Sequence, residues 1–297
     1  MKLTLRIQRL ALLLACVVFH NAFAQHLFAS GESLYALPAA TPSTVEVLID
    51  QLAHSDVAVL GEIHDNPRHH QLRGELLRQL PAASKTVVAE HLNWRLRFKE
   101  GGELLTNLQA AGFDGKGWGW PLHQPLFEAV TAMQMPLVGG NLPGESIKEV
   151  FKTRGQSLPE AVRSLLAKAP FDEQQRKAMN EEIDQGHCGA MPASMFEGMA
   201  AVQRGRDAAM AEVALAHLPS VVVAGNGHAW KHLGVPFVVN KAVPQLRSVS
   251  VLFMEWDDTR PSSEKQAFLA ELAPQADYVW LTPSHPRKDP CESLRKK

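Results

Sequence analysis

Residues 57–70 read VAVLGEIHDNPRHH: a short apolar run, then a glycine, then a dense set of polar side chains. The run VAVL is continuous rather than alternating, which is typical of a strand covered on both faces of a parallel sheet. Asn66 is a good helix N-cap and Pro67 a good first helical residue, so a helix is expected next. The stretch therefore predicts a strand, a sharp turn at Gly61 and a helix.

The same alternation of elements continues along the chain. Five further apolar runs predict strands: TVVAE (86–90), PLVGG (136–140), SVVVAGN (220–226), SVSVLFMEW (248–256) and DYVWL (277–281). Helical patterns lie around residues 122–135, 145–152, 158–167, 172–184 and 192–218. Strands that alternate with helices predict an α/β fold with a mainly parallel central sheet flanked by helices.

Residues 142–219 contain helical patterns and no strand pattern. No Gly/Ser/Pro-rich linker separates this segment from its neighbours. We therefore expect a single α/β domain over residues 25–297, with a helical subregion embedded at about 142–219.

The composition narrows the class of protein. With 297 residues, 45% of them hydrophobic, and a formal net charge of −1, the chain is long enough to bury a substantial core. It has no long basic run, and the final SLRKK is too short to act as a basic arm. Nucleic acid is therefore not expected as a partner.

The first 24 residues have the pattern of a signal peptide. Basic residues come first, an apolar stretch follows at 10–19, and Ala22-Phe23-Ala24 forms a small-x-small cleavage site. The apolar stretch is too short to span a bilayer. We expect export to the periplasm or the outer membrane, and an alternative is cleavage before Cys16 with lipidation of that cysteine.

Cysteine usage agrees with export. If Cys16 leaves with the signal peptide, Cys188 and Cys291 remain, and a pair in an oxidising compartment predicts one disulfide. The alternative is two unrelated buried thiols, because the sequence does not give their separation.

A second strand also ends in Gly-x-x-His. Residues 221–228, VVVAGNGH, match AVLGEIH in form, and a third strand ends in Glu90. Ligands bind beyond the carboxyl ends of strands in open parallel sheets. We therefore expect Glu62, His64, Glu90 and His228 to meet at one edge, the alternative being that the histidines only cap the strand ends.

These four residues suit metal or acid–base chemistry. His64, His228 and Glu90 are candidate ligands of a divalent metal ion, with Glu62 as general base in a hydrolase. Arg206 lies on the apolar face of the 192–218 helix, where a guanidinium needs a carboxylate. Glu62 or Glu90 would serve as its partner, or else nearby Asp207 or Glu212.

The chain resembles a known family over nearly its whole predicted mature length. The matching strings are LGEIHDNPRHH, VVAEH, HCGAMP, QRGRDAAMA, AGNGHAWKHLGVP and VWLTPSHPRKDPC, in order from about Leu60 to Cys291. They resemble the ChaN-like haem-binding family of the Tiki/TraB/erythromycin-esterase superfamily. The resemblance implies an exported or outer-membrane-anchored bacterial protein that takes part in iron acquisition and binds haem between the subunits of a dimer.

The resemblance leaves two functions open. The family's haem iron looks to be held by tyrosine, and this chain has only Tyr35 and Tyr278. Tyr35 is therefore a candidate haem ligand, and His69, His70 and His232 are candidate substitutes. Enzymatic members of the superfamily use paired Gly-x-x-His motifs, so a metal-dependent hydrolase is the alternative, and an envelope protein with a vestigial site is a third.

Overall fold

The computed structural model describes residues 29–289 and 291–292. The predicted signal peptide and the alternative lipidation site at Cys16 lie outside these residues. None of the helices in the described part is both long and apolar enough to cross a membrane.

One eight-stranded sheet forms the centre of the fold. The strands are β1 (Ser33–Ala36), β2 (Thr41–Pro42), β3 (Val57–Leu60), β4 (Thr86–Asn93), β5 (Leu137–Asn141), β6 (Ser220–Val223), β7 (Ser248–Glu255) and β8 (Tyr278–Thr282). Their order is β2-β1-β8-β7-β3-β6-β4-β5. Every neighbouring pair from β8 to β5 is parallel, and only β1 pairs antiparallel. The predicted, mainly parallel sheet is confirmed, and all six predicted strands are present.

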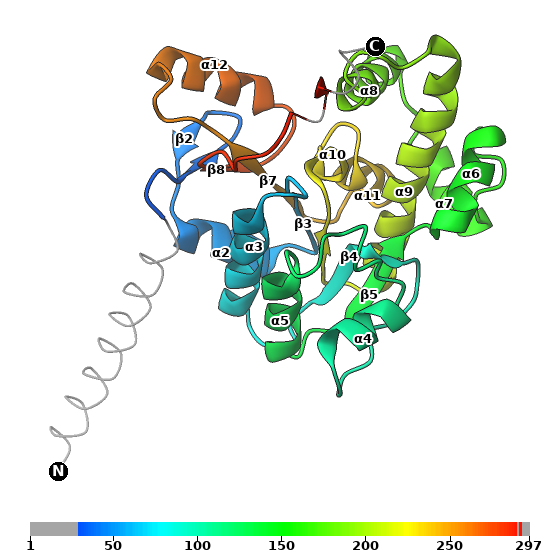
Figure 1. The fold of residues 1–297 in the computed structure, drawn as a ribbon, viewed down its shortest axis with the longest axis horizontal. Helices are drawn as coiled ribbons and strands as arrows, with labels where there is room; N and C mark the ends of the chain where they lie inside the picture. Colours follow the sequence, from blue (N-terminus) through cyan, green and yellow to red (C-terminus); the bar gives the residue numbers. More distant parts are fainter. Residues whose placement is uncertain (1–28, 290, 293–297) are drawn as a thin grey trace, which may run out of the picture.

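Helices cover both faces of the sheet (Figure 1). They are α2 (Val45–His54), α3 (Pro67–Gln79), α4 (Leu104–Ala110), α5 (Gln124–Ala132), α6 (Gly144–Lys152), α7 (Glu160–Lys168), α8 (Glu173–Gly186), α9 (Phe196–Ala216), α10 (Asn226–Ala229), α11 (Val235–Ala242) and α12 (Ser262–Leu272), with a 3₁₀ turn, η1 (Ala193–Met195). Helices α2 to α5 pack on one face, and α9, α11 and α12 pack on the other. Because the strands are buried on both sides, they read as continuous apolar runs.

Local sequence explains where two of these helices start. Asn66 caps α3, its side chain accepting a hydrogen bond from the Arg68 N–H, and Pro67 is the first helical residue, as predicted. Asp172 and Gln175 form a reciprocal capping box at the start of α8.

Residues 142–219 carry α6, α7, α8, η1 and α9, and no strand, as predicted. These elements form a helical lobe beside the β5 side of the sheet, on the right of Figure 1.

The carboxyl-terminal segment ties this lobe to the sheet. A disulfide joins Cys188, at the end of α8, to Cys291, which confirms the predicted pairing. Arg287 in the same segment pairs with Asp65, after β3, at 2.7 Å and with Glu255 at the end of β7. The segment therefore links α8 to the loop that follows β3.

Candidate functional site

The polar residues at the carboxyl ends of the strands form two clusters, because successive side chains of β4 point to opposite faces of the sheet. The side chain of Glu90 points to the face covered by α9, where it meets His228. The next residue, His91, points to the opposite face and contacts Phe127 of α5. Successive side chains of a strand point to opposite faces, so these two adjacent polar residues enter two neighbouring clusters. The clusters still interact, because Arg73 and His64 both act electrostatically on Glu90.

The first group, here called the histidine cluster, surrounds Glu62, which is only 2% exposed. Oε1 of Glu62 lies 2.7 Å from His64 Nδ1, 3.3 Å from His91 Nε2 and 3.5 Å from His123 Nε2. The other carboxylate oxygen, Oε2, contacts Arg73 and lies 2.9 Å from His70 Nδ1. One buried carboxylate therefore meets four imidazoles and a guanidinium.

Helix α3 supplies the guanidinium. Its buried face carries His69, His70 and Arg73 beside its leucines. Arg73 is fully buried, and burial lowers its pKa to about 9, which still leaves the guanidinium charged at neutral pH. His70 donates from Nε2 to the His64 carbonyl, so its Nδ1 accepts from Arg73 at 3.0 Å. Burial lowers the His70 pKa to about 4, in keeping with a neutral ring.

His91 and His123 have unused hydrogen-bonding atoms. Neither ring nitrogen of His123 has a hydrogen-bond partner among the described residues, and Nδ1 of His91 has none. Burial lowers the pKa of both imidazoles, so both are neutral. Trp118 lies against His91 with ring centroids 4.5 Å apart and edge-on to His64 at 5.1 Å. The half-exposed His64 is the opening of the cluster toward solvent.

The second group, here called the His228 triad, comprises His228, Asp207 and Glu90. His228 Nδ1 lies 2.6 Å from Asp207 Oδ1, and Nε2 lies 3.3 Å from Glu90 Oε1. Burial alone would lower the His228 pKa, but the two carboxylates outweigh it and raise the pKa to about 10. Glu90 also accepts from the Gly225 N–H at 2.7 Å. His228 is therefore an imidazolium held between two carboxylates.

Two glycines make this packing possible. A Cβ on Gly61 would overlap the Asn226 side chain, which donates from Nδ2 to the Phe253 carbonyl. A Cβ on Gly225 would come within 2.7 Å of His64 Nε2. The glycines of the two Gly-x-x-His motifs thus allow the loops after β3 and β6 to approach each other closely.

Two predicted roles at this edge are not found. Arg206 is half-buried and, within the described part of the chain, pairs with no carboxylate; Arg73 holds Glu62 instead, because α3 and not α9 packs on that face. His64, Glu90 and His228 form no compact ligand group in the described residues. The group whose ligand atoms all lie within 4.8 Å of one another is Glu62, His91 and His123.

The four candidate haem ligands lie in separate places. His69 is fully buried; its Nδ1 accepts from the Ile63 N–H and its Nε2 donates to Thr282, so both nitrogens are engaged. His70 is buried in the histidine cluster. Tyr35 lies in β1, three strand positions from β3. The ring of His232 stacks on Trp230.

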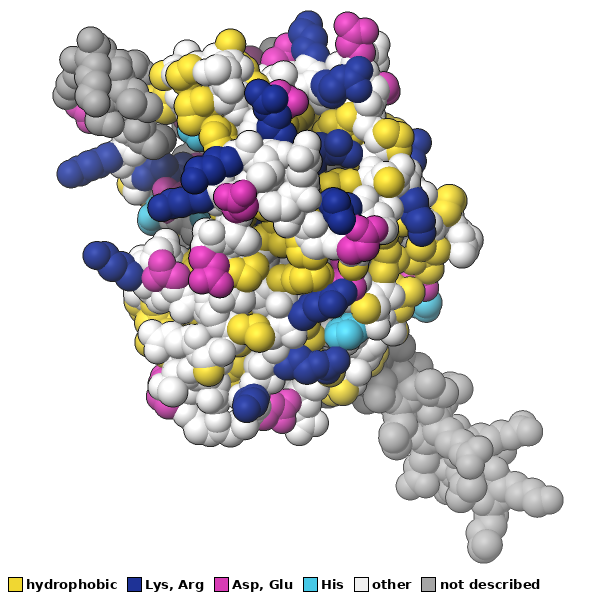
Figure 2. Space-filling model, turned by 90° about the vertical axis from the view of Figure 1, so that its right-hand side faces the viewer, with side chains coloured by type: hydrophobic (Ala, Val, Ile, Leu, Met, Phe, Trp, Pro, Cys, Tyr) yellow, Lys and Arg dark blue, Asp and Glu magenta, His cyan; other side chains and the backbone are white. Residues whose placement is uncertain are grey.

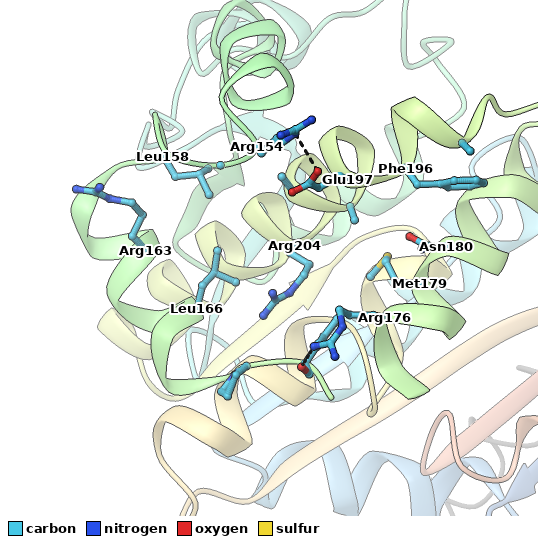
Figure 3. A pocket seen from close by; sticks show the side chains of 16 residues that line it. Arg154, Leu158, Arg163, Leu166, Arg176, Met179, Asn180, Phe196, Glu197 and Arg204 are labelled. Carbon is cyan, nitrogen blue, oxygen red and sulfur yellow. Dashed lines mark hydrogen bonds and ion pairs between the residues drawn. The ribbon is translucent and has the colours of Figure 1, made fainter. Parts of the chain in front are cut away.

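The helical lobe contains a pocket of about 750 Å³, the arginine pocket (Figure 3). The described residues that line it are Arg154, Gly155, Leu158, Arg163, Leu166, Pro170, Phe171, Arg176, Met179, Asn180, Ala193, Phe196, Glu197, Ala200, Ala201 and Arg204. They include four arginines but neither histidine nor tyrosine, so none of the four candidate haem ligands lines it. Figure 2, which faces the right-hand side of Figure 1, shows Lys and Arg side chains around exposed hydrophobic surface.

The family is settled by comparison with known proteins. The family model for haem-binding uptake, Tiki superfamily, ChaN, matches residues 48–239. The chain belongs to this family. Among solved structures, ChaN of Campylobacter jejuni, described as showing cofacial haem binding, matches at a TM-score of 0.64 and 19% identity, over 84% of this chain and 96% of that one. This similarity shows that the chain has the same fold as that ChaN protein.

A second solved structure, of a Bacillus cereus protein, matches at a TM-score of 0.42 and 12% identity, over 72% of this chain and 70% of that one. A search of curated proteins found no match.

Sequence reasoning missed three residues of the site in this ChaN-family chain: Arg73, His91 and His123. Arg73 had a usable signal, because it lies three positions after His70 and so on the same helix face. His91 also had one, since it directly follows Glu90 at a strand end. His123 precedes α5 in a loop with no strand nearby, so only the folded chain brings it to Glu62.

Proposed function

We propose that this protein binds haem in the arginine pocket of its helical lobe. The observation that carries the proposal is the state of Arg176 and Arg204. Arg176 donates to the Phe171 carbonyl and Arg204 to the Ala169 carbonyl, each at 2.6 Å. In the part of the chain that the structure describes, neither guanidinium pairs with a carboxylate. Unpaired positive charges at an apolar pocket favour an anionic, largely apolar ligand.

The lining fits the body and the carboxylates of haem. Apolar side chains from α7, α8, η1, α9 and the loops before α7 and α8 supply the walls, and the volume lies within the usual range of ligand sites. Arg204 lies over the Phe171 ring, 4.0 Å from its centroid, so its position is fixed. Guanidinium groups pair well with carboxylates such as the two propionates of haem. Membership in a haem-binding family supports the same ligand.

The described residues of the lining offer iron no histidine or tyrosine. Met179, the one thioether among the described lining residues, is 2% exposed. Of the candidate ligands, His232 is joined to the pocket by a hydrogen bond. Its carbonyl accepts from Gln175, the residue before Arg176, which lines the pocket. We therefore infer that the propionates and the macrocycle, and not an axial bond, supply most of the affinity.

The test is a titration of the mature protein with haemin and, separately, with metal-free protoporphyrin IX. We expect saturable binding of both at one molecule per chain, with affinities within about tenfold. Arg176→Gln and Arg204→Gln should each weaken binding about 10- to 100-fold, the value of a hydrogen bond between charged groups. Arg260→Gln is the matched control, because Arg260 pairs with Glu264 on α12, away from the lobe.

Two results would overturn parts of this proposal. Haemin that binds equally well to both arginine variants would exclude the arginine pocket. Haemin binding without protoporphyrin binding would show that iron ligation dominates, and loss of the Soret shift in His232→Ala would then assign the ligand.

We also propose that the protein is exported and acts in haem or iron acquisition at the periplasm or outer membrane. The basic, apolar and small-residue pattern of residues 1–24 supports export, and so does the disulfide, because disulfides persist in oxidising compartments. Mass spectrometry of the protein from its native membrane and periplasmic fractions tests this. An N-terminus at Gln25 supports soluble export, a lipidated Cys16 supports anchoring, and an intact Met1 refutes both.

We propose that the haem-loaded form is a homodimer. The side chains of Arg154, Arg163 and Arg176 at the pocket are exposed, so a flat ligand there keeps one apolar face open to solvent. A second copy would bury that face. Light scattering should show a mass that doubles on haemin addition, and an unchanged monomer would refute the dimer.

A further inference from the structure

Three ligand atoms converge in the histidine cluster, and one of them, His123 Nε2, has no hydrogen-bond partner among the described residues. Oε1 of Glu62 lies 3.3 Å from His91 Nε2 and 3.5 Å from His123 Nε2, and all three atoms lie within 4.8 Å of one another. The three side chains come from the end of β3, from β4 and from the residue before α5, so no single motif brings them together.

The spacing fits a bound ion. Two ligands that each lie about 2.1 Å from a tetrahedral ion are about 3.4 Å apart, which is midway between the two observed distances. A hydrogen bond of 3.5 Å is too long to hold His123, and its other nitrogen has no partner among the described residues. Buried polar atoms without partners are rare in native proteins, and an ion would give His123 Nε2 the partner that it lacks among the described residues.

The surroundings prepare Glu62 for this role. Arg73 contacts Oε2 and fixes the carboxylate, which leaves Oε1 directed toward His91 and His123. Trp118 packs on the cluster and excludes water from one side. His64, with its side chain 47% exposed, lies 2.7 Å from the same Oε1, so its hydrogen bond orients that oxygen and its exposure gives the site a path to solvent.

We propose that Glu62, His91 and His123 bind one divalent transition-metal ion, with an open coordination position on the side of His64. Two imidazoles and one carboxylate form the donor set of three-ligand zinc sites and of facial Fe(II) sites. The site lies on the α3/α5 face of the sheet, while the arginine pocket lies in the helical lobe. The proposal therefore does not depend on haem binding and can fail or succeed separately.

This site differs from the set His64, Glu90 and His228. Both ring nitrogens of His228 already face carboxylates, Nδ1 lying 2.6 Å from Asp207 and Nε2 3.3 Å from Glu90. Variants of His123 and His228 therefore separate the two assignments.

The experiment uses the mature chain, treated with chelator and then titrated with Co²⁺, whose visible absorption reports its coordination geometry, and competed with Zn²⁺. We expect one Co²⁺ per chain with a tetrahedral spectrum that Zn²⁺ abolishes. His91→Gln and His123→Gln should weaken binding at least about 100-fold. His228→Gln should bind as the unmodified protein does, with circular dichroism confirming that each variant is folded.

Binding lost in His228→Gln but kept in His123→Gln would overturn the assignment, as would the absence of any stoichiometric Co²⁺ or Zn²⁺. X-ray absorption of the Zn²⁺-loaded, unmodified protein gives an answer even if the variants fail to fold. It should show at least two imidazoles and a carboxylate oxygen around zinc, and a shell of oxygens alone would refute the site.

Discussion

The charge of His228 should make the stability of the protein depend on alkaline pH. Its pKa is raised from 6.5 in the unfolded chain to about 10 by Glu90 and Asp207, which overcome the effect of burial. This difference corresponds to about 5 kcal/mol at 1.36 kcal/mol for each pH unit. Because the folded pKa is the higher one, the stabilisation is complete below pH 6.5 and is lost as the pH rises through 10.

The assay is urea unfolding of the unmodified protein and of His228→Gln at pH 7 and pH 9. Over these two pH units the unmodified protein should lose roughly 3 kcal/mol of unfolding free energy that the variant does not lose. The comparison cancels the groups that lie away from His228, because they titrate alike in both proteins. Parallel pH profiles for the two proteins would show that His228 is not an imidazolium in the folded state, and the arrangement of the triad would be refuted.

Three other substitutions test contacts that stabilise the fold: two lie at the site and one is the disulfide. Arg73→Met should lower the unfolding free energy by about 3–5 kcal/mol, because it leaves the buried Glu62 carboxylate unpaired; adding Glu62→Gln should recover much of the loss in urea unfolding. Gly61→Ala should cost about 1–3 kcal/mol in the same assay, since its Cβ would overlap Asn226, and an unchanged midpoint would contradict the close approach of the two loops. Cys188→Ser removes a disulfide that spans 103 residues and should lower the unfolding free energy by about 2–5 kcal/mol. Reduction should lower the unfolding free energy of the unmodified protein by the same amount and should leave that of the variant unchanged.

The sequence predicts the sheet well because each central strand is buried on both faces. Two strands, β3 and β6, lie in continuous apolar runs, which identify them as buried strands. Their parallel pairing follows from the helices that lie between them in the sequence. The β1–β2 edge is missed because β2 has only two residues, both exposed. A strand that short has no periodicity to detect.

The site is harder to predict because its residues depend on which face each side chain takes. The predicted edge does carry all four residues, Glu62, His64, Glu90 and His228. The prediction treats them as one group, however, whereas β4 directs Glu90 and His91 to opposite faces of the sheet. The structure does not pair Arg206 with Glu62 or Glu90, for the same reason. A helix pattern identifies the buried face of α9 without saying which side of the sheet that helix covers.

The carboxyl-terminal segment connects two regions that the chain otherwise keeps far apart. It is bonded covalently to α8 through Cys188 and Cys291, and by an ion pair to Asp65 through Arg287. Helix α8 lines the arginine pocket, and Asp65 follows the loop of Glu62 and His64. The disulfide and the ion pair therefore couple the two regions: an outward shift of α8 would pull on the Arg287–Asp65 contact and, through it, on the loop after β3.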